Sequence, residues 1–133
     1  LLWHEYLPQA WLDLVDIKDQ VNDLIWDQLD PDRYDFYETN AYSGTALRTL
    51  GKKKYHVIID DGSHHRDDIK FVADHYYHML APGGVMILED IPDESLLAEL
   101  TALFSPEEQK GIRVFDVRKS GRFDDLIWAI IKE

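Results

Sequence analysis

Acidic residues stand at the ends of three apolar runs, and their types and spacing could bind a cation. They are Asp16, Asp60, Asp61, Glu89 and Asp90. Because clustered like charges destabilise a fold, a cation, a proton or a hydrogen-bond network must compensate them if they converge. A divalent cation held by carboxylates and water is the simplest compensator.

One histidine could add acid-base chemistry to these carboxylates. His64 comes three residues after Asp61, and an imidazole there could take a proton from a hydroxyl group near neutral pH. Both residues also have ordinary structural interpretations. Asp61 or Ser63 could cap the next helix, and His64 could be a solvent-facing histidine at its start. His65 is interpreted as structural.

Alternating strands and helices must position these groups. Apolar runs predict strands at Trp11 to Ile17, which we expect to be buried, and at Tyr34 to Glu38, Tyr55 to Ile59, Val85 to Leu88, Ile112 to Val117 and Leu126 to Ile131. Helical spacing of apolar residues predicts helices at Leu1 to Leu7, Lys18 to Leu29, Arg66 to Leu80 and Pro92 to Phe104. The turn Ala81-Pro82-Gly83-Gly84 is expected to end the third helix.

This order of elements predicts an α/β fold with a mostly parallel sheet covered by helices on both faces. The last two strands have no room for a crossover helix between them, so we expect them to form an antiparallel pair. In an open parallel sheet, ligands collect beyond the carboxyl ends of the strands. The acidic residues fall at such ends, so the sequence predicts one acidic crevice.

Length and composition exclude several classes of protein. The chain has 133 residues, 45% of them hydrophobic, which predicts one domain over residues 1–133. A net charge of −12 argues against a nucleic acid partner. Without cysteine, the ligands left for a metal suit hard or borderline cations. With neither a membrane segment nor a signal peptide in the pattern, we expect a soluble, cytoplasmic protein without a membrane partner.

Three motifs carry a resemblance to a known family: Val57 to His64 (VIIDDGSH), Leu80 to Gly84 (LAPGG) and Leu88 to Ile91 (LEDI). Together they resemble the metal-dependent sugar O-methyltransferases of macrolide biosynthesis, which are class I S-adenosylmethionine (SAM)-dependent methyltransferases. The resemblance spans Trp3 to about Ile91 and implies a Rossmann-like methyltransferase sheet. It also implies transfer of a methyl group to a hydroxyl of a sugar, polyol or other small natural product.

The resemblance also implies roles for single residues. Asp61, Glu89 and Asp90 match the family's magnesium ligands, and His64 matches its general base. For the SAM cofactor, Asp16 matches the acid that binds the ribose hydroxyls. The adenine contacts correspond to Asn40, Ala41 and Tyr42, and Asp60 would lie on the cofactor side of the metal.

The sequence departs from the family at two places. Relatives usually carry Asp where this chain has Asn40, and no Gly-x-Gly-x-x-Gly loop occurs in the sequence. We therefore expect a fragment that begins in the helix after that loop. Two alternatives stay open: a metal-independent small-molecule methyltransferase, and a non-catalytic cofactor-binding or interaction module of the same fold. A nicotinamide-dependent oxidoreductase fits less well, because the paired acids have no role there.

Overall fold

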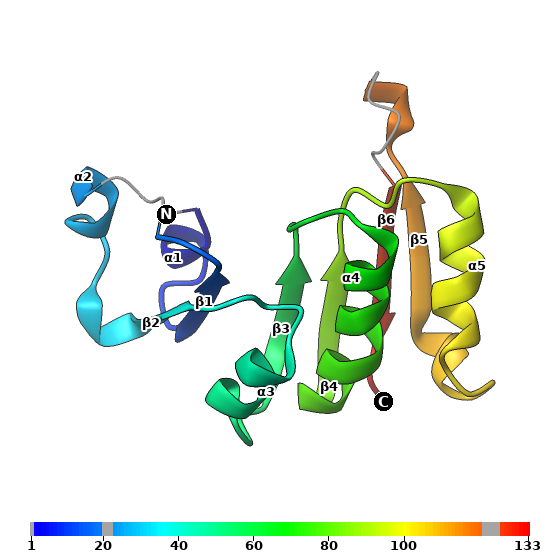
Figure 1. Cartoon of the computed structure of the whole chain (residues 1–133), viewed down its shortest axis with the longest axis horizontal. Coiled ribbons are helices and arrows are strands. Elements are labelled where there is room, and N and C mark those ends of the chain that lie inside the picture. The colour runs from blue at the N-terminus through cyan, green and yellow to red at the C-terminus, as the bar shows by residue number, and fades with distance from the viewer. Residues whose placement is uncertain (1, 20–22, 121–125) are drawn as a thin grey trace. The chain divides into compact units, whose positions relative to one another are not determined.

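The structure is a computed structural model that describes residues 2–19, 23–120 and 126–133 (Figure 1). Internal contacts divide the chain into two compact units, residues 1–49 and 50–133, which are described separately. The expectation of one domain over the whole chain stays a prediction. None of the helices that the structure describes combines the length and the apolar composition that crossing a bilayer requires.

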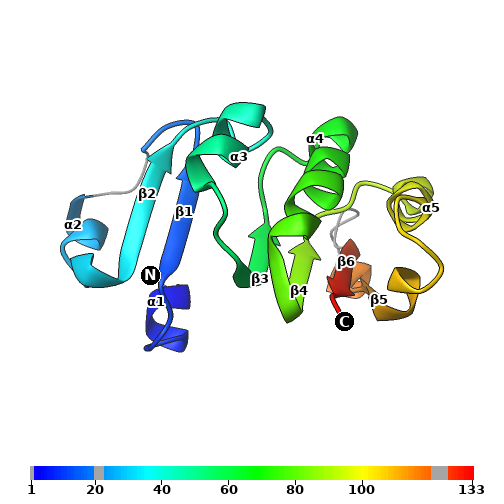
Figure 2. The ribbon, with the colours of Figure 1, turned by 90° about the horizontal axis from the view of Figure 1, so that it is seen from below.

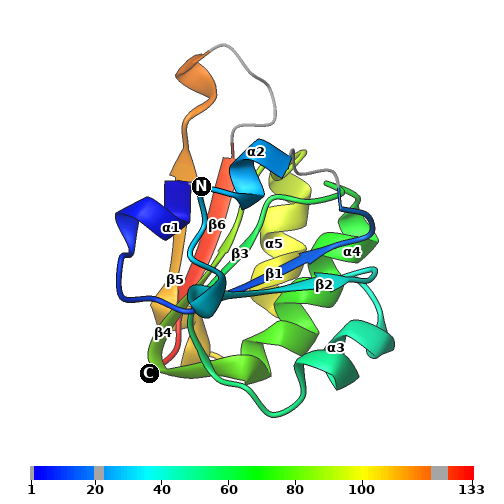
Figure 3. The ribbon, with the colours of Figure 1, turned by 90° about the vertical axis from the view of Figure 1, so that its left-hand side faces the viewer.

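The first unit contains a pair of parallel strands, β1 (Leu12–Asp16) and β2 (Tyr34–Glu38), which lie side by side (Figures 2 and 3). Their register sets Asp16 opposite Glu38. The prediction that the first strand is buried is wrong. Its residues are half-buried or exposed, because β1 pairs with β2 alone among the described strands.

Short helices accompany this pair: α1 (Leu2–Tyr6), α2 (Asp23–Trp26) and α3 (Gly44–Leu50). The helix predicted from 18 to 29 is observed over α2, while residues 20–22 lie outside the described residues. Helix α3 was not predicted from the sequence. Ser43 caps it, since the Ser43 hydroxyl accepts a hydrogen bond from Ala46 N at 3.2 Å.

The second unit is built on a four-stranded sheet with the order β3-β4-β6-β5. Its strands are β3 (Tyr55–Asp60), β4 (Leu80–Leu88), β5 (Ile112–Asp116) and β6 (Leu126–Ile131). Since β6 runs antiparallel to β4 and β5, the other three strands all point in one direction. The predicted mostly parallel sheet with an antiparallel pair at the end of the chain is confirmed.

Two helices cover one face of this sheet, α4 (Arg66–Phe71) and α5 (Glu94–Ala102) (Figures 1 and 2). The apolar core beneath them joins both helices to β4 and β6. Its most deeply buried members are Ile69, Leu80, Met86, Leu88, Ile91, Leu96, Leu100, Leu126, Trp128 and Ile130. Because β4 contributes to this core and β3 is paired along β4, the loops that follow these two strands start from fixed positions.

The segment from 66 to 84 differs from the prediction of one regular helix and a turn. After α4 the chain forms a π-helical turn at Val72–Tyr76 and a 3-10 turn at Tyr77–Met79, and β4 already begins at Leu80. The Pro-Gly-Gly turn lies inside β4, where Gly83 N donates to Lys132 O at 2.7 Å. A Cβ on Gly84 would lie 2.9 Å from Tyr55 O, so only glycine fits there.

Candidate functional site

The loops after β3 and β4 begin side by side. Asp60 ends β3, and its carbonyl oxygen accepts a hydrogen bond from Glu89 N at 2.9 Å, just beyond the end of β4. This bond extends the parallel pairing by one step beyond Leu88. The residues after each strand therefore leave the sheet at the same edge, as predicted for the paired acids.

Three of the candidate side chains form one cluster at this edge. His64 Nε2 lies 3.5 Å from an Asp61 carboxylate oxygen and 3.9 Å from an Asp90 carboxylate oxygen. One ligand atom from each residue lies within 4.8 Å of the others, so a small cation could bind among them. Asp90 is the most enclosed of the three at 16% side-chain exposure, against 65% for Asp61.

The backbone at this cluster is unusual. Among the described residues, His64 and Asp90 are the non-glycine residues with positive φ, at 55° and 50°. The left-handed region is unfavourable for residues with a Cβ, and such strain persists where the surrounding structure enforces it. Here it is found at two of the residues that the sequence singled out.

His64 Nε2 also has no hydrogen-bond partner within the described residues, although the atom itself is buried. The ring is 37% exposed, so solvent reaches its other parts. A buried nitrogen facing two carboxylates is costly unless a donor or a cation lies among them. The donor set, with a majority of carboxylate oxygens, fits a hard divalent cation.

Glu89 stands apart from the three-residue cluster but interacts electrostatically with it. Burial, followed by the charges of Asp61 and Asp90, raises the pKa of Glu89 above its ordinary value. The charges of the neighbouring carboxylates thus contribute, after burial, to the raised pKa of Glu89. Glu89 remains a predicted metal ligand.

Helix α4, which follows the loop after β3, has no side-chain hydrogen bond at its N-cap. His65 occupies the N-cap position of α4 without a side-chain hydrogen bond to the helix. Ser63 instead donates its hydroxyl proton to Asp68 at 2.5 Å, which braces the loop against the first turn. The alternative in which Asp61 or Ser63 caps α4 is thus not what the structure contains.

The residues predicted to contact the cofactor, apart from Asp60, belong to the first unit. Asp16 ends β1, where its carbonyl oxygen accepts a hydrogen bond from Thr39 N at 2.8 Å. Its exposed carboxylate accepts a long hydrogen bond from Lys18 N at 3.4 Å. The carboxylate therefore keeps acceptor capacity for a ligand such as a diol.

Asn40 shapes the loop after β2. Its side-chain oxygen accepts a hydrogen bond from Tyr42 N at 2.9 Å, and its carbonyl oxygen accepts one from the Ser43 hydroxyl at 2.6 Å. Asn40 therefore fixes the turn that leads into α3. Ala41 and Tyr42 are half-buried within this turn.

Two polar residues with clear structural partners were not found from the sequence. His4 is buried, and its Nε2 accepts a hydrogen bond from Asp30 N at 3.0 Å. Arg66 bonds to three residues of α5 and its N-cap, which no local pattern could reveal because they lie 27 to 33 positions away. A lone arginine at the first position of a helix is the signal that was available.

No protein-family model matches the chain, and no curated protein matches it. Solved structures do match. The MycE methyltransferase of the mycinamycin biosynthetic pathway, in complex with Mg and SAH, aligns with a TM-score of 0.70 at 16% identity over 99% of this chain. This fold is Rossmann-like. The chain spans 39% of the length of that MycE chain.

Other solved structures align over almost the same range. The fibrillarin pre-rRNA processing protein of Methanococcus jannaschii gives a TM-score of 0.64 at 12% identity, over 95% of this chain and 57% of its own. The 1,6-didemethyltoxoflavin-N1-methyltransferase of Burkholderia thailandensis gives 0.61 at 15% identity, over 98% and 75%. The α/β fold with its mostly parallel sheet is therefore shared with these solved structures.

Proposed function

We propose that this chain belongs to a SAM-dependent O-methyltransferase that uses a divalent cation, with a hydroxyl of a sugar or other small polyol as the methyl acceptor. The observation that carries the proposal is the cluster of Asp61, His64 and Asp90 beyond β3 and β4. In this fold class, ligands bind at that edge of the sheet. The net charge of −12 favours a small molecule over a nucleic acid as the acceptor.

The residues of the chain fit both SAM and a divalent cation. Asp16 has free acceptor capacity at the end of β1 for ribose hydroxyls, and Asn40, Ala41 and Tyr42 form the adjacent turn. Asp61, Glu89 and Asp90 would hold Mg²⁺, which prefers oxygen ligands. When bound, SAM would supply the methyl group and Mg²⁺ would acidify and orient a hydroxyl.

His64 would act as the base rather than as a ligand. Mg²⁺ binds imidazole poorly compared with carboxylate, so Nε2 would stay free for a proton. This nitrogen is buried beside Asp61 and Asp90, which lie close enough to stabilise the imidazolium after it accepts the proton from the acceptor hydroxyl. The MycE structures, one with Mycinamycin VI in addition to Mg and SAH, support the choice of acceptor class.

The test compares two neighbouring histidines. His64→Ala should lower turnover by about 10²- to 10⁴-fold while SAM affinity stays near that of the wild type. His65→Ala, at the N-cap of α4, should leave turnover nearly unchanged. A fully active His64→Ala variant would remove His64 from the reaction, and an inactive His65→Ala variant would transfer the role to His65.

Two further measurements separate the alternatives. A chelator should abolish turnover and Mg²⁺ should restore it; activity that persists in the chelator would identify a metal-independent methyltransferase. Calorimetric titration with SAM should give saturable binding. Binding without turnover on any polyol tested would favour a non-catalytic cofactor-binding module, and the absence of binding would contradict the proposed function.

A further inference from the structure

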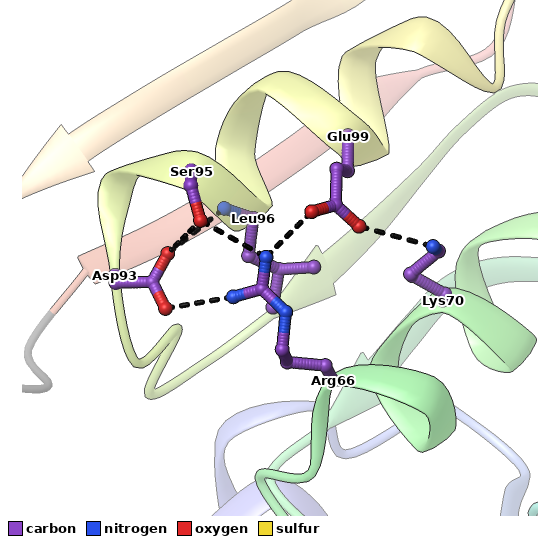
Figure 4. Close-up of polar contacts among 6 residues, drawn as sticks. All are labelled: Arg66, Lys70, Asp93, Ser95, Leu96 and Glu99. Carbon is purple, nitrogen blue, oxygen red and sulfur yellow. Dashed lines mark hydrogen bonds and ion pairs between the residues drawn. The ribbon is translucent and has the colours of Figure 1, made fainter.

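Arg66 connects the starts of the two helices that follow the acidic loops (Figure 4). One guanidinium nitrogen, Nη1, donates to an Asp93 carboxylate oxygen at 2.7 Å. The other, Nη2, donates to the Ser95 hydroxyl at 2.9 Å and to a Glu99 carboxylate oxygen at 2.6 Å. Arg66 is the first residue of α4; Asp93 and Ser95 lie at the start of α5, and Glu99 lies one turn further along the helix.

Each acceptor on α5 is itself held in place. The second Asp93 oxygen caps α5 by accepting from Leu96 N at 3.0 Å, and it also accepts from the Ser95 hydroxyl at 2.6 Å. These bonds, together with that from Arg66, lower the pKa of Asp93 to about 2, so it is ionised at neutral pH. Lys70 donates to the other Glu99 oxygen at 3.0 Å. The guanidinium therefore meets a fixed set of acceptors rather than one free side chain.

The bonds from Arg66 to Asp93, Ser95 and Glu99, which we call the clamp, join positions close in sequence to the acidic cluster. Arg66 comes two residues after His64, and Asp93 comes three residues after Asp90. Between Asp90 and Asp93, the fully buried Ile91 fixes the loop, since Ile91 N donates to Leu126 O at 2.9 Å. Movement of α4 relative to α5 would thus change the separation between His64 and Asp90.

We propose that Arg66 is a positioning residue: by bonding to Asp93 it holds the loop of Asp61 and His64 against the loop of Asp90 and sets the geometry of the cation site. The part of this inference that concerns a cation rests on the proposed function. The part that concerns the two loops does not.

The charge of Arg66 and its proposed positioning role give opposite expectations for cation affinity when Arg66 is removed. Arg66 carries a positive charge near an acidic cluster, so it repels a bound cation, and its removal would strengthen cation binding if charge alone mattered. If Arg66 positions the loops, its removal should weaken binding, as happens when residues that orient metal ligands are lost. The direction of the change therefore separates the two roles.

The experiment titrates the wild type and three variants with Mn²⁺ and measures the bound fraction by electron paramagnetic resonance. Arg66→Gln should weaken Mn²⁺ binding by roughly tenfold. Arg66→Lys keeps the charge but lacks the planar fork, and should also weaken binding. Arg118→Gln is the matched control. Arg118 is 35% exposed, against 36% for Arg66, and donates to Glu94 at the start of α5 without contacting α4 among the described bonds.

Unchanged or tighter Mn²⁺ binding in Arg66→Gln would overturn the inference while leaving the proposed cation site intact. A second readout needs no cation. Hydrogen exchange of the backbone amides from 61 to 65 and from 89 to 92 should be faster in Arg66→Gln than in Arg118→Gln. If the wild type binds no Mn²⁺, the cation part of the proposed function fails, and equal exchange in the two variants would then refute the clamp.

Discussion

His64 and Asp90 face each other from two loops, with 3.9 Å between Nε2 and a carboxylate oxygen, and both have a left-handed backbone with φ of 55° and 50°. A single non-glycine residue with positive φ is uncommon, although Asp and His adopt this region more readily than most residues. Two of them opposite each other, one a histidine, indicate that the loops are shaped to bring these side chains together at a cost in backbone energy.

The strain at His64 predicts an order of stability for two variants that both remove the ring. His64→Gly should be more stable than His64→Ala by about 1 kcal/mol, because glycine adopts positive φ without the clash of a Cβ. Urea unfolding of the two variants measures the difference. Equal free energies of unfolding would mean that the backbone at 64 is not strained.

Glu89 should reduce the stability of the cation-free protein. Its pKa is raised, first by burial and then by the charges of Asp61 and Asp90, so the folded chain binds the proton more tightly than the unfolded chain does. The free energy of unfolding therefore falls as pH rises from the ordinary pKa of about 4.3 through the raised value. Glu89→Gln removes the charge and should be more stable than the wild type at pH 7.

Thermal unfolding at two pH values checks this sign. The advantage of Glu89→Gln should disappear below pH 4, where the wild-type carboxyl is protonated as well. Added Mg²⁺ should stabilise the wild type more than the variant, since the amide oxygen of Gln is a weaker ligand than the carboxylate that it replaces. A wild type that is the more stable protein at pH 7 without a cation would contradict the repulsion.

Asp16 should contribute to cofactor affinity through its carboxylate. Asp16→Asn should weaken SAM binding by about tenfold to hundredfold, the range for losing a hydrogen bond to a charged group. Glu38→Gln is the control, because Glu38 is the exposed residue paired with Asp16 at the end of β2. Calorimetry with SAM measures both. Equal affinities in the two variants would remove Asp16 from the cofactor site.

The sequence predicted the elements whose signals are local. The strand from Tyr34 to Glu38 matches β2 at both ends, because it is rich in aromatic residues and follows the helix-breaking Asp-Pro-Asp turn. The capping box that begins at Ser105 is a local feature as well: Ser105 N donates to Glu108 at 2.9 Å, and Glu108 N donates to the Ser105 hydroxyl at 3.4 Å.

Features that depend on distant partners were not predictable. The start of β4 at Leu80 depends on pairing with Tyr55, and the Pro-Gly-Gly turn is held by Lys132, which is 49 residues from Gly83. The same holds at the site. Motif spacing selected Asp61, His64 and Asp90, but their close approach and the Arg66 bonds arise from packing of α4 and α5 on one sheet. By contrast, α3 could have been found from Ser43 followed by Ala46, Leu47 and Leu50.

The most direct test of the cation site is a crystal structure of the protein with Mn²⁺ and SAH, using the anomalous signal of manganese to locate the ion. We expect one ion at the edge of the sheet beyond β3 and β4, with oxygens of Asp61, Glu89 and Asp90 at about 2.0 to 2.6 Å. His64 Nε2 should lie outside its coordination sphere, facing the acceptor side. An ion ligated by His64 with Glu89 turned away, or no ion at the cluster at saturating Mn²⁺, would contradict the proposed site.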